Sequence, residues 1–411
     1  MTDFDPLVVK ADFPLLSREV HGKAMVYLDS AATSIPPQSV LDAMDRYYAH
    51  SHSNVHRGVY VTAEEATHLY EGARIAVGKF IGASQPEEEI VFTKNCTEAI
   101  NLLARSWGEA NLFEGDVVVL SEMEHHANIV PWLQLRDRKG IELRYLKITD
   151  DGHLDLEDLD LILQGAKLLS VTAMSNVLGT INDLDLLTKA AHRHGALIAV
   201  DGAQSVPHLA TDVAAMDIDF LAFSGHKALG PTGIGVFFAR AELLAAMPPF
   251  LGGGGMILDV HLDRFTPATG PTRFEAGTPP IAEAVGLHAG LDYLSALGMD
   301  AVRAHELILT DYALNYLEEE LGESLRIFGP STAKDRGAVI SFELEGVHPH
   351  DVGQVLDQSG VCVRPGHHCA KPLMRRLGVN ATARASFGIY NNEDDVHVLA
   401  KSLGEATRLF S

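Results

Sequence analysis

Cysteine and positive charge are scarce in this chain of 411 residues. Its three cysteines, Cys96, Cys362 and Cys369, are too few and too odd in number for a disulfide framework. Its 32 lysines and arginines are outnumbered by 55 aspartates and glutamates, which gives a net charge of −23. Such a charge repels phosphate backbones and anionic membrane surfaces, so we expect no nucleic-acid partner.

Long apolar runs and a secretory leader are also missing. The longest uncharged run, residues 243–258, has 16 residues that include two prolines and four glycines, so it predicts no transmembrane helix. Residues 1–5 are acidic and lack the apolar stretch of a signal peptide. We therefore expect a cytoplasmic protein that has no membrane partner.

Short β-rich runs do alternate with helical segments between residues 85 and 240. The predicted strands are residues 89–93, 116–120, 142–147, 167–173, 196–201 and 219–224. The predicted helices are residues 97–107, 127–139, 155–164 and 183–194. This alternation indicates βαβ units and a mostly parallel sheet, whose ligands sit beyond the carboxyl ends of the strands.

The pattern changes after the four glycines at residues 252–255. Loops are predicted first, then one long helical stretch at residues 281–321. The remaining chain mixes strand and helix, at residues 338–343, 350–358 and 393–409. We predict an α/β fold with a large domain, residues 21–295, and a smaller α+β domain formed by residues 1–20 and 296–411.

Two predicted strands of the large domain end near side chains that suit one cofactor. Lys227 follows the strand at 219–224, and Asp201 ends the strand before it. Desolvation lowers the pKa of a lysine at such a place and makes it a nucleophilic amine. Pyridoxal phosphate needs a lysine for its Schiff base and a carboxylate that keeps its pyridine nitrogen protonated. The pair predicts this cofactor, although either residue alone would be an ordinary turn residue.

Other polar residues follow the predicted strands. Thr97 opens a helix whose N-terminal N–H groups could bind phosphate, although an ordinary helix cap has the same pattern. Ser224 and His226 flank Lys227 with groups that suit an anion. His125 comes just after the strand at 116–120, where an imidazole could stack on a cofactor ring or be a plain loop residue.

Residues 363–370 read Val-Arg-Pro-Gly-His-His-Cys-Ala. Arginine and histidine side chains beside an exposed thiol favour its nucleophilic thiolate form. The competing interpretation is a zinc site made of Cys362, His367, His368 and Cys369, but its spacing matches no standard structural-zinc pattern, and we expect no metal. Arg384, on a strand-like run, suits recognition of a carboxylate, unless it is a surface arginine.

Seven segments together resemble the SufS-type (group II) cysteine desulfurases, which use pyridoxal phosphate. They are residues 24–33 (AMVYLDSAAT), 55–58 (VHRG), 122–131 (EMEHHANIVP), 175–179 (SNVLG), 224–227 (SGHK), 273–278 (RFEAGT) and 364–369 (RPGHHC). The resemblance implies a fold-type I transferase and a homodimer with active sites at the subunit interface. It also implies conversion of L-cysteine to L-alanine through a persulfide on the last cysteine, which supplies sulfur for iron–sulfur cluster assembly.

The resemblance further implies a role for each matching residue. Lys227, His125 and Cys369 are the catalytic residues. The remaining cofactor contacts are Thr97, Asn176, Asp201, Gln204, Ser224, His226 and, from the other subunit, Thr278. The substrate contacts are Arg384, for the α-carboxylate, together with Asn176, His56 and Arg364. Two departures from the family pattern are Asn95-Cys96, in the phosphate turn, and Ala228-Leu229, after the lysine.

A histidine bears on the sulfur acceptor. His350 matches the position where relatives served by zinc-containing SufU-type acceptors carry a zinc-binding histidine, although it also fits a plain helix start. We therefore expect a SufU-type acceptor, with a SufE-type acceptor as the alternative. Selenocysteine lyase is the alternative activity of the same fold, and a non-catalytic sulfur carrier or zinc module is the alternative from another class.

Overall fold

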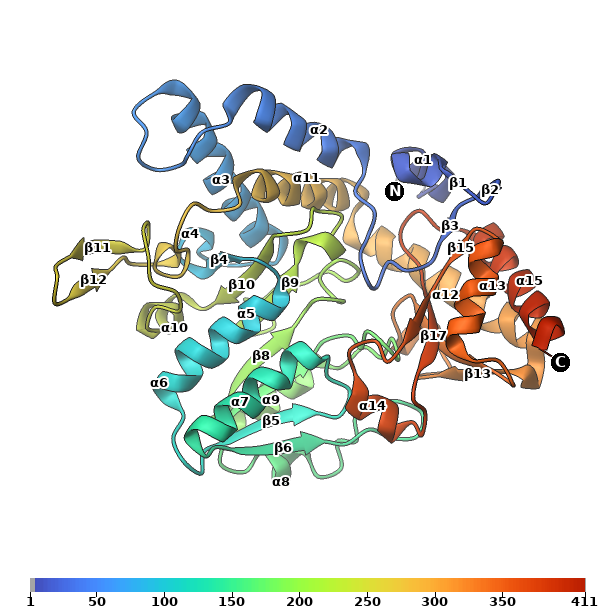
Figure 1. The fold of residues 1–411 in the computed structure, drawn as a ribbon. Coiled ribbons are helices and arrows are strands. Elements are labelled where there is room, and N and C mark those ends of the chain that lie inside the picture. Colours follow the sequence, from blue (N-terminus) through green and yellow to red (C-terminus); the bar gives the residue numbers. More distant parts are fainter. Residues whose placement is uncertain (1–3, 411) are drawn as a thin grey trace.

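The computed structural model describes residues 4–410. A central sheet has the strand order β4-β10-β9-β8-β7-β5-β6 (Figure 1). Its strands are β4 (Ile90–Thr93), β5 (Val117–Ser121), β6 (Glu142–Leu146), β7 (Ala166–Thr172), β8 (Leu197–Asp201), β9 (Phe220–Ser224) and β10 (Gly235–Ala239). Only β10, which was not predicted, runs antiparallel to its neighbours in this sheet. The predicted α/β fold with a mostly parallel sheet is confirmed.

Both faces of this sheet are buried, because alternate side chains of a strand point to opposite faces. On β8, Ile198 and Val200 pack into one apolar cluster with residues of α9 (Leu184–Arg193). Ala199, between them, packs into a second cluster with α5 (Cys96–Leu103). Helices α2 (Gln38–Arg46), α3 (Val61–Phe80) and α11 (Ile281–Leu297) pack together beside β4.

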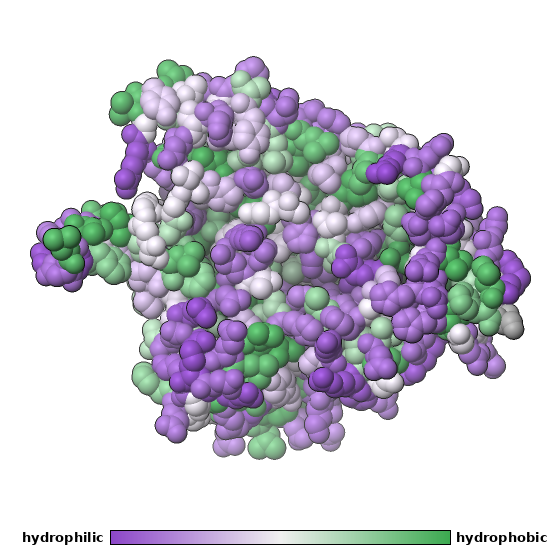
Figure 2. Space-filling view, viewed as in Figure 1, coloured by the Kyte–Doolittle hydropathy of each residue, from purple (hydrophilic) through white to green (hydrophobic). Residues whose placement is uncertain are grey.

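Two predicted segments differ in the structure. The prediction of a single helical stretch at residues 281–321 is wrong, because the structure has two helices there. Gly298 has φ 84°, a conformation that ends α11, and α12 (Met299–Leu321) starts after it. The loops predicted after residue 255 contain a hairpin of β11 (Ile257–Val260) and β12 (Phe265–Pro267). It projects from the body of the molecule, with Leu258, Leu262 and Phe265 exposed (Figures 1 and 2).

A smaller sheet has the order β13-β14-β17-β16. These strands are β13 (Leu325–Phe328), β14 (Val339–Leu344), β16 (Arg364–Gly366) and β17 (Thr382–Ser386). Helices α12, α13 (Pro349–Gln358) and α15 (Glu393–Phe410) pack with it around a third apolar cluster. Val26 and Leu28 join this cluster, because β3 (Val26–Tyr27) pairs with β15 (Val361–Cys362).

The start of the described chain packs beside this smaller sheet. Lys10, on α1 (Pro6–Ala11), lies 3.1 Å from the Asp395 carboxylate at the start of α15. Phe13 contacts the rings of Tyr293 and Tyr390 edge-on. Residues 1–3 of the predicted small domain lie outside the described residues, and the division at residues 21–295 stays a prediction.

The other elements are short or peripheral, apart from α7. They are β1 (Glu19–Val20), β2 (Lys23–Ala24), α4 (Pro86–Glu89), α6 (Glu109–Asn111), α7 (Val130–Lys139), α8 (Leu159–Leu163), α10 (Ala241–Ala246) and α14 (Lys371–Arg376). The helix predicted at residues 155–164 is thus only the five residues of α8. Within residues 4–410, no helix combines the length and apolar character that a membrane crossing needs.

Candidate active site

A cavity of about 230 Å³ lies beyond the carboxyl ends of the central strands. It is bounded on the other side by β17 and by the loop after β16. The predicted site residues that line it are Thr97, His125, Asn176, Asp201, Gln204, Ser224, His226, Lys227, Arg364, Cys369 and Arg384. Residues scattered over 288 positions of the chain thus surround one space.

Lys227 and Asp201 meet because their strands are neighbours. β8 and β9 are parallel, with Asp201 opposite Ala222, and Lys227 lies in the short turn after β9. Desolvation lowers the pKa of Lys227, the Arg384 charge acts in the same direction, and Asp201 opposes both. A larger fraction of the amine is therefore neutral and nucleophilic, as the sequence predicts.

The turn between β4 and α5 forms one end of the cavity. Ser224 Oγ accepts the Cys96 N–H at 2.9 Å, which fixes the start of α5 against the end of β9. Asn95 caps the helix by accepting the Glu98 N–H at 2.9 Å. A Cβ atom at Gly235 would lie 2.4 Å from the Asn95 Cα, so only glycine allows this close approach. The Cys96 and Glu98 N–H groups are used in these contacts, so the Thr97 N–H and hydroxyl, together with the His226 ring, are the groups that suit a phosphate.

Cys96 contacts Asp201, the carboxylate of the cofactor pair. Its Sγ is 3.5 Å from Asp201 Oδ1 and is buried. Burial, and then the Asp201 charge, raise the pKa of this thiol well above its usual value. The sequence marks Cys96 only as a departure from the family pattern, and its contact with Asp201 was not predicted.

His125 presents one defined nitrogen to the cavity. Its Nδ1 accepts the Ala127 N–H at 3.1 Å, so the neutral ring carries its proton on Nε2. Desolvation lowers the pKa of His125 to about 4, which keeps the ring neutral near pH 7. Beneath it, the fully buried Glu124 accepts hydrogen bonds from Ser121 and from the Thr172 N–H. Sequence reasoning missed Glu124.

Cys369 is exposed on a loop that several hydrogen bonds hold. Asn176 Nδ2 donates to the His368 carbonyl at 2.8 Å, and the His126 N–H donates to the Cys369 carbonyl at 2.7 Å. The Lys371 N–H donates to His126 Nε2 at 2.9 Å. His368 is buried, and its Nε2 lies 2.9 Å from Thr382 Oγ1.

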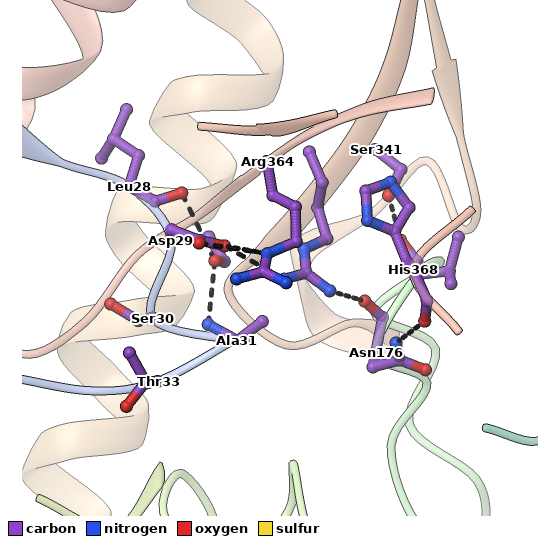
Figure 3. Close-up of polar contacts among 12 residues, drawn as sticks. Leu28, Asp29, Ser30, Ala31, Thr33, Asn176, Ser341, Arg364 and His368 are labelled. Atoms are coloured by element: carbon purple, nitrogen blue, oxygen red, sulfur yellow. Dashed lines mark hydrogen bonds and ion pairs between the residues drawn. The ribbon is translucent and has the colours of Figure 1, made fainter. Parts of the chain in front are cut away.

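Arg384 is buried rather than a surface arginine. Its Nη1 donates to the Asn176 carbonyl at 2.9 Å and its Nη2 to Asp29 Oδ1 at 3.2 Å (Figure 3). Its Nε is buried without a partner. Arg364 also contacts Asp29, a residue that lay within a matching segment but was not predicted as functional.

Three predicted residues lie outside the cavity of the single chain. Thr278 is exposed in the loop before α11, and His350 is exposed at the start of α13. His56 is exposed, with φ 69°, and its Nε2 lies 2.8 Å from Glu71 Oε1. Among residues 4–410, no group of three histidine, cysteine or acidic side chains is arranged for a metal ion.

Comparisons with known proteins agree with this geometry. The aminotransferase class-V family matches residues 26–399. The chain belongs to that family. It is 50% identical to a probable cysteine desulfurase of Streptomyces coelicolor, over 99% of this chain and 98% of the relative. It is 49% identical to a cysteine desulfurase of Dickeya dadantii, over 98% and 96% of the two chains.

A solved structure supports the same grouping. The apo cysteine desulfurase of Thermococcus onnurineus superposes with a TM-score of 0.92 at 42% identity, over 98% of this chain and 97% of that one. As a class-V family member 50% identical to a probable cysteine desulfurase, this enzyme uses pyridoxal phosphate. The residues present fit that cofactor: one cavity holds an amine, a carboxylate and a helix N-terminus closely packed against Gly235.

Proposed function

We propose that this enzyme, a pyridoxal-phosphate-dependent cysteine desulfurase, converts L-cysteine to L-alanine and takes the sulfur as a persulfide on Cys369. The observation that carries the proposal is the placement of an exposed thiol in the same cavity as Lys227, Asp201 and a buried arginine. A transaminase would need no such thiol.

Different residues of the cavity would bind different parts of the cofactor and the substrate. Lys227 would attach the cofactor, and Asp201 would keep its ring nitrogen protonated. Thr97, Ser224 and His226 would hold its phosphate, His125 would stack on its ring, and Gln204 and Asn176 would contact its polar groups. Bound pyridoxal phosphate supplies an electron sink for the substrate carbon. The unpartnered Nε of Arg384 is left for the substrate carboxylate.

The sulfur step needs no external oxidant. The Cys369 sulfur attacks the substrate sulfur, an S–S bond forms, and the carbon–sulfur bond breaks with its electron pair on carbon. The carbon takes up a proton and becomes the methyl group of alanine, so thiol plus cysteine gives persulfide plus alanine. Lys227 Nζ and His125 Nε2 both line the cavity and can carry that proton.

The test is release of sulfide and alanine from L-cysteine under reductant. Cys369→Ser should abolish both, whereas Cys362→Ser is the matched control, because Cys362 lies on β15 outside the cavity. Unchanged release by the Cys369 variant would refute the covalent step. A Cys369 variant that loses L-cysteine turnover but still releases selenide from L-selenocysteine would favour the selenocysteine lyase alternative.

The proposal includes a homodimer whose partner completes each site. Thr278 and His56 lie outside the cavity. His56 contacts Glu71, and Glu71 and Glu275 both bind Arg74, which links His56 to the segment that precedes Thr278. Exposed apolar residues, Val59 and Val61 beside His56 and Leu262 on the hairpin, suit a subunit interface. A chain that sediments as a monomer with full activity would contradict this assembly.

The sulfur acceptor is proposed to be a SufU-type zinc protein that serves cytoplasmic iron–sulfur cluster assembly. His350 is exposed, its ring stacks on His348 with centroids 5.5 Å apart, and an imidazole is a good zinc ligand. His350→Ala should lower turnover with a zinc-loaded acceptor, while the matched control, His153→Ala on the large domain, should not. Equal stimulation of turnover by the zinc-loaded acceptor in both variants would favour the alternative, a SufE-type acceptor.

A further inference from the structure

Two arginines stand opposite each other on the wall of the cavity. Arg364 on β16 and Arg384 on β17 are direct partners in the register of the small sheet, and both line the cavity. Like charges directly opposite each other destabilise a sheet. The pair therefore depends on a negative group placed between the two guanidinium groups.

Asp29 supplies that negative group from a distant segment. Its Oδ2 lies 3.1 Å from Arg364 Nε, and its Oδ1 lies 3.2 Å from Arg384 Nη2 (Figure 3). Asp29 is mostly buried, since only 16% of its side chain is exposed. Its backbone is held as well, because the Ala32 N–H donates to the Asp29 carbonyl at 3.0 Å. The carboxylate is thus a fixed part of the wall.

The charges on this wall sum to one positive unit. Two guanidinium groups and one carboxylate give that sum, because burial lowers the pKa of the neighbouring His368 to about 3 and keeps it neutral. The Arg384 edge with the unpartnered Nε remains for an incoming carboxylate. The Arg364 Nε edge is already taken by Asp29.

We propose that Asp29 determines substrate specificity by occupying Arg364, so that the site accepts amino acids with a neutral side chain and disfavours those with an acidic one. The inference rests on the proposed role of Arg384 in binding the α-carboxylate. The single net positive charge of the wall matches one carboxylate, because Asp29 already offsets the charge of Arg364. A second negative charge on the substrate would lie near the Asp29 carboxylate and a guanidinium whose charge that carboxylate already offsets.

The test compares L-aspartate with L-asparagine, which have the same shape and differ in side-chain charge. Their Kd values for the holoenzyme are measured by calorimetry in wild type and in Asp29→Asn. The variant frees Arg364, so the affinity for L-aspartate relative to L-asparagine should rise at least about tenfold, the effect of one charged hydrogen bond. In Asp29→Asn/Arg364→Gln the ratio should return toward the wild-type value. An unchanged ratio in Asp29→Asn would overturn the inference.

Two further measurements keep the result decisive. Arg364→Gln alone leaves Asp29 without that partner, so the affinity for L-aspartate relative to L-asparagine should fall below the wild-type value. This variant tests the inference even if Asp29→Asn fails to fold. Asp150→Asn, which breaks the exposed pair with Arg376, is the matched control and should leave the ratio unchanged. Alanine release from L-cysteine by wild type tests the proposed function separately, because calorimetry needs no turnover.

Discussion

The two sides of the cavity are built in different ways. On the side of the large sheet, Asp201 and Lys227 follow adjacent parallel strands whose residues are buried on both faces. On the side of the small sheet, His368 and Cys369 have φ values of 50° and 54°, although neither is glycine. Each such residue costs about 1–3 kcal/mol and persists only where surrounding contacts hold it.

This difference separates two requirements of the proposed reaction. The cofactor side needs fixed positions, and strand ends in a packed sheet provide them. The sulfur side needs an exposed thiol that can reach a second protein, and a strained loop held by a few hydrogen bonds is of lower local stability. We therefore expect substitutions on the first side to abolish the reaction and substitutions on the second side, apart from Cys369 itself, to change its rate or affinity.

The largest effect should come from Lys227→Ala, which removes the cofactor's attachment point. Turnover should fall at least about a thousandfold, because the variant loses both a nucleophile and a proton carrier. The fold should persist, and the other contacts can still retain the cofactor without a bond. Borohydride reduction followed by mass spectrometry should find the cofactor on Lys227 in wild type and on no residue of the variant.

The control for this prediction is Lys189→Ala, which removes an exposed lysine paired with Asp185. It should leave both labelling and activity unchanged. Covalent cofactor at a different lysine in the Lys227 variant would mean that the side of the large sheet is assigned wrongly.

Arg384→Ala should produce the next largest effect, on the side of the small sheet. The loss of a charged contact of about 1.5–3 kcal/mol should raise the KM for L-cysteine about ten- to a hundredfold. Because Arg384 contacts no reacting atom in the proposed arrangement, kcat should change less than KM. Steady-state kinetics measure both, and a fall in kcat with an unchanged KM would contradict a substrate-binding role.

Glu124 gives a test of the large-sheet side through stability. Burial raises its pKa to about 8, although hydrogen bonds from Ser121 and Asn128 and from the Thr172 N–H oppose the shift. The group is protonated in the folded chain and ionised in the unfolded chain between the unfolded value of 4.5 and about pH 8. Its stabilisation is therefore full below pH 4.5 and is lost as pH rises to about 8.

The measurement is the melting temperature of wild type and Glu124→Gln between pH 4 and pH 9. The wild-type value should decrease relative to the variant by about 2 °C per pH unit within that window, and the difference should be flat outside it. A parallel pair of curves would show that Glu124 keeps one protonation state throughout.

The sequence predicted these two sides unequally, for physical reasons. Lys227, Asp201 and His125 were predicted because each lies at or shortly after the end of a strand with a clear local pattern. Asp29 was missed because its partners, Arg364 and Arg384, are 335 and 355 residues away, and no local pattern records such a contact. The break at Gly298 was missed because the apolar helical pattern continues on both sides of it.

The smallest effect should come from His126→Phe, which loosens the Cys369 loop. The substitution keeps a ring of similar size but removes the Nε2 atom that accepts the Lys371 N–H. One hydrogen bond of about 0.5–1.5 kcal/mol should raise the open fraction of the loop roughly two- to tenfold. Hydrogen exchange at residues 367–371 and alkylation of Cys369 should both become faster by that factor.

Lower pH should have the same effect on this loop in wild type, because a protonated His126 cannot accept the Lys371 N–H, and burial has already lowered the pKa of His126. The variant should show no such pH response, so equal acid-induced loosening in both proteins would assign the effect to another group.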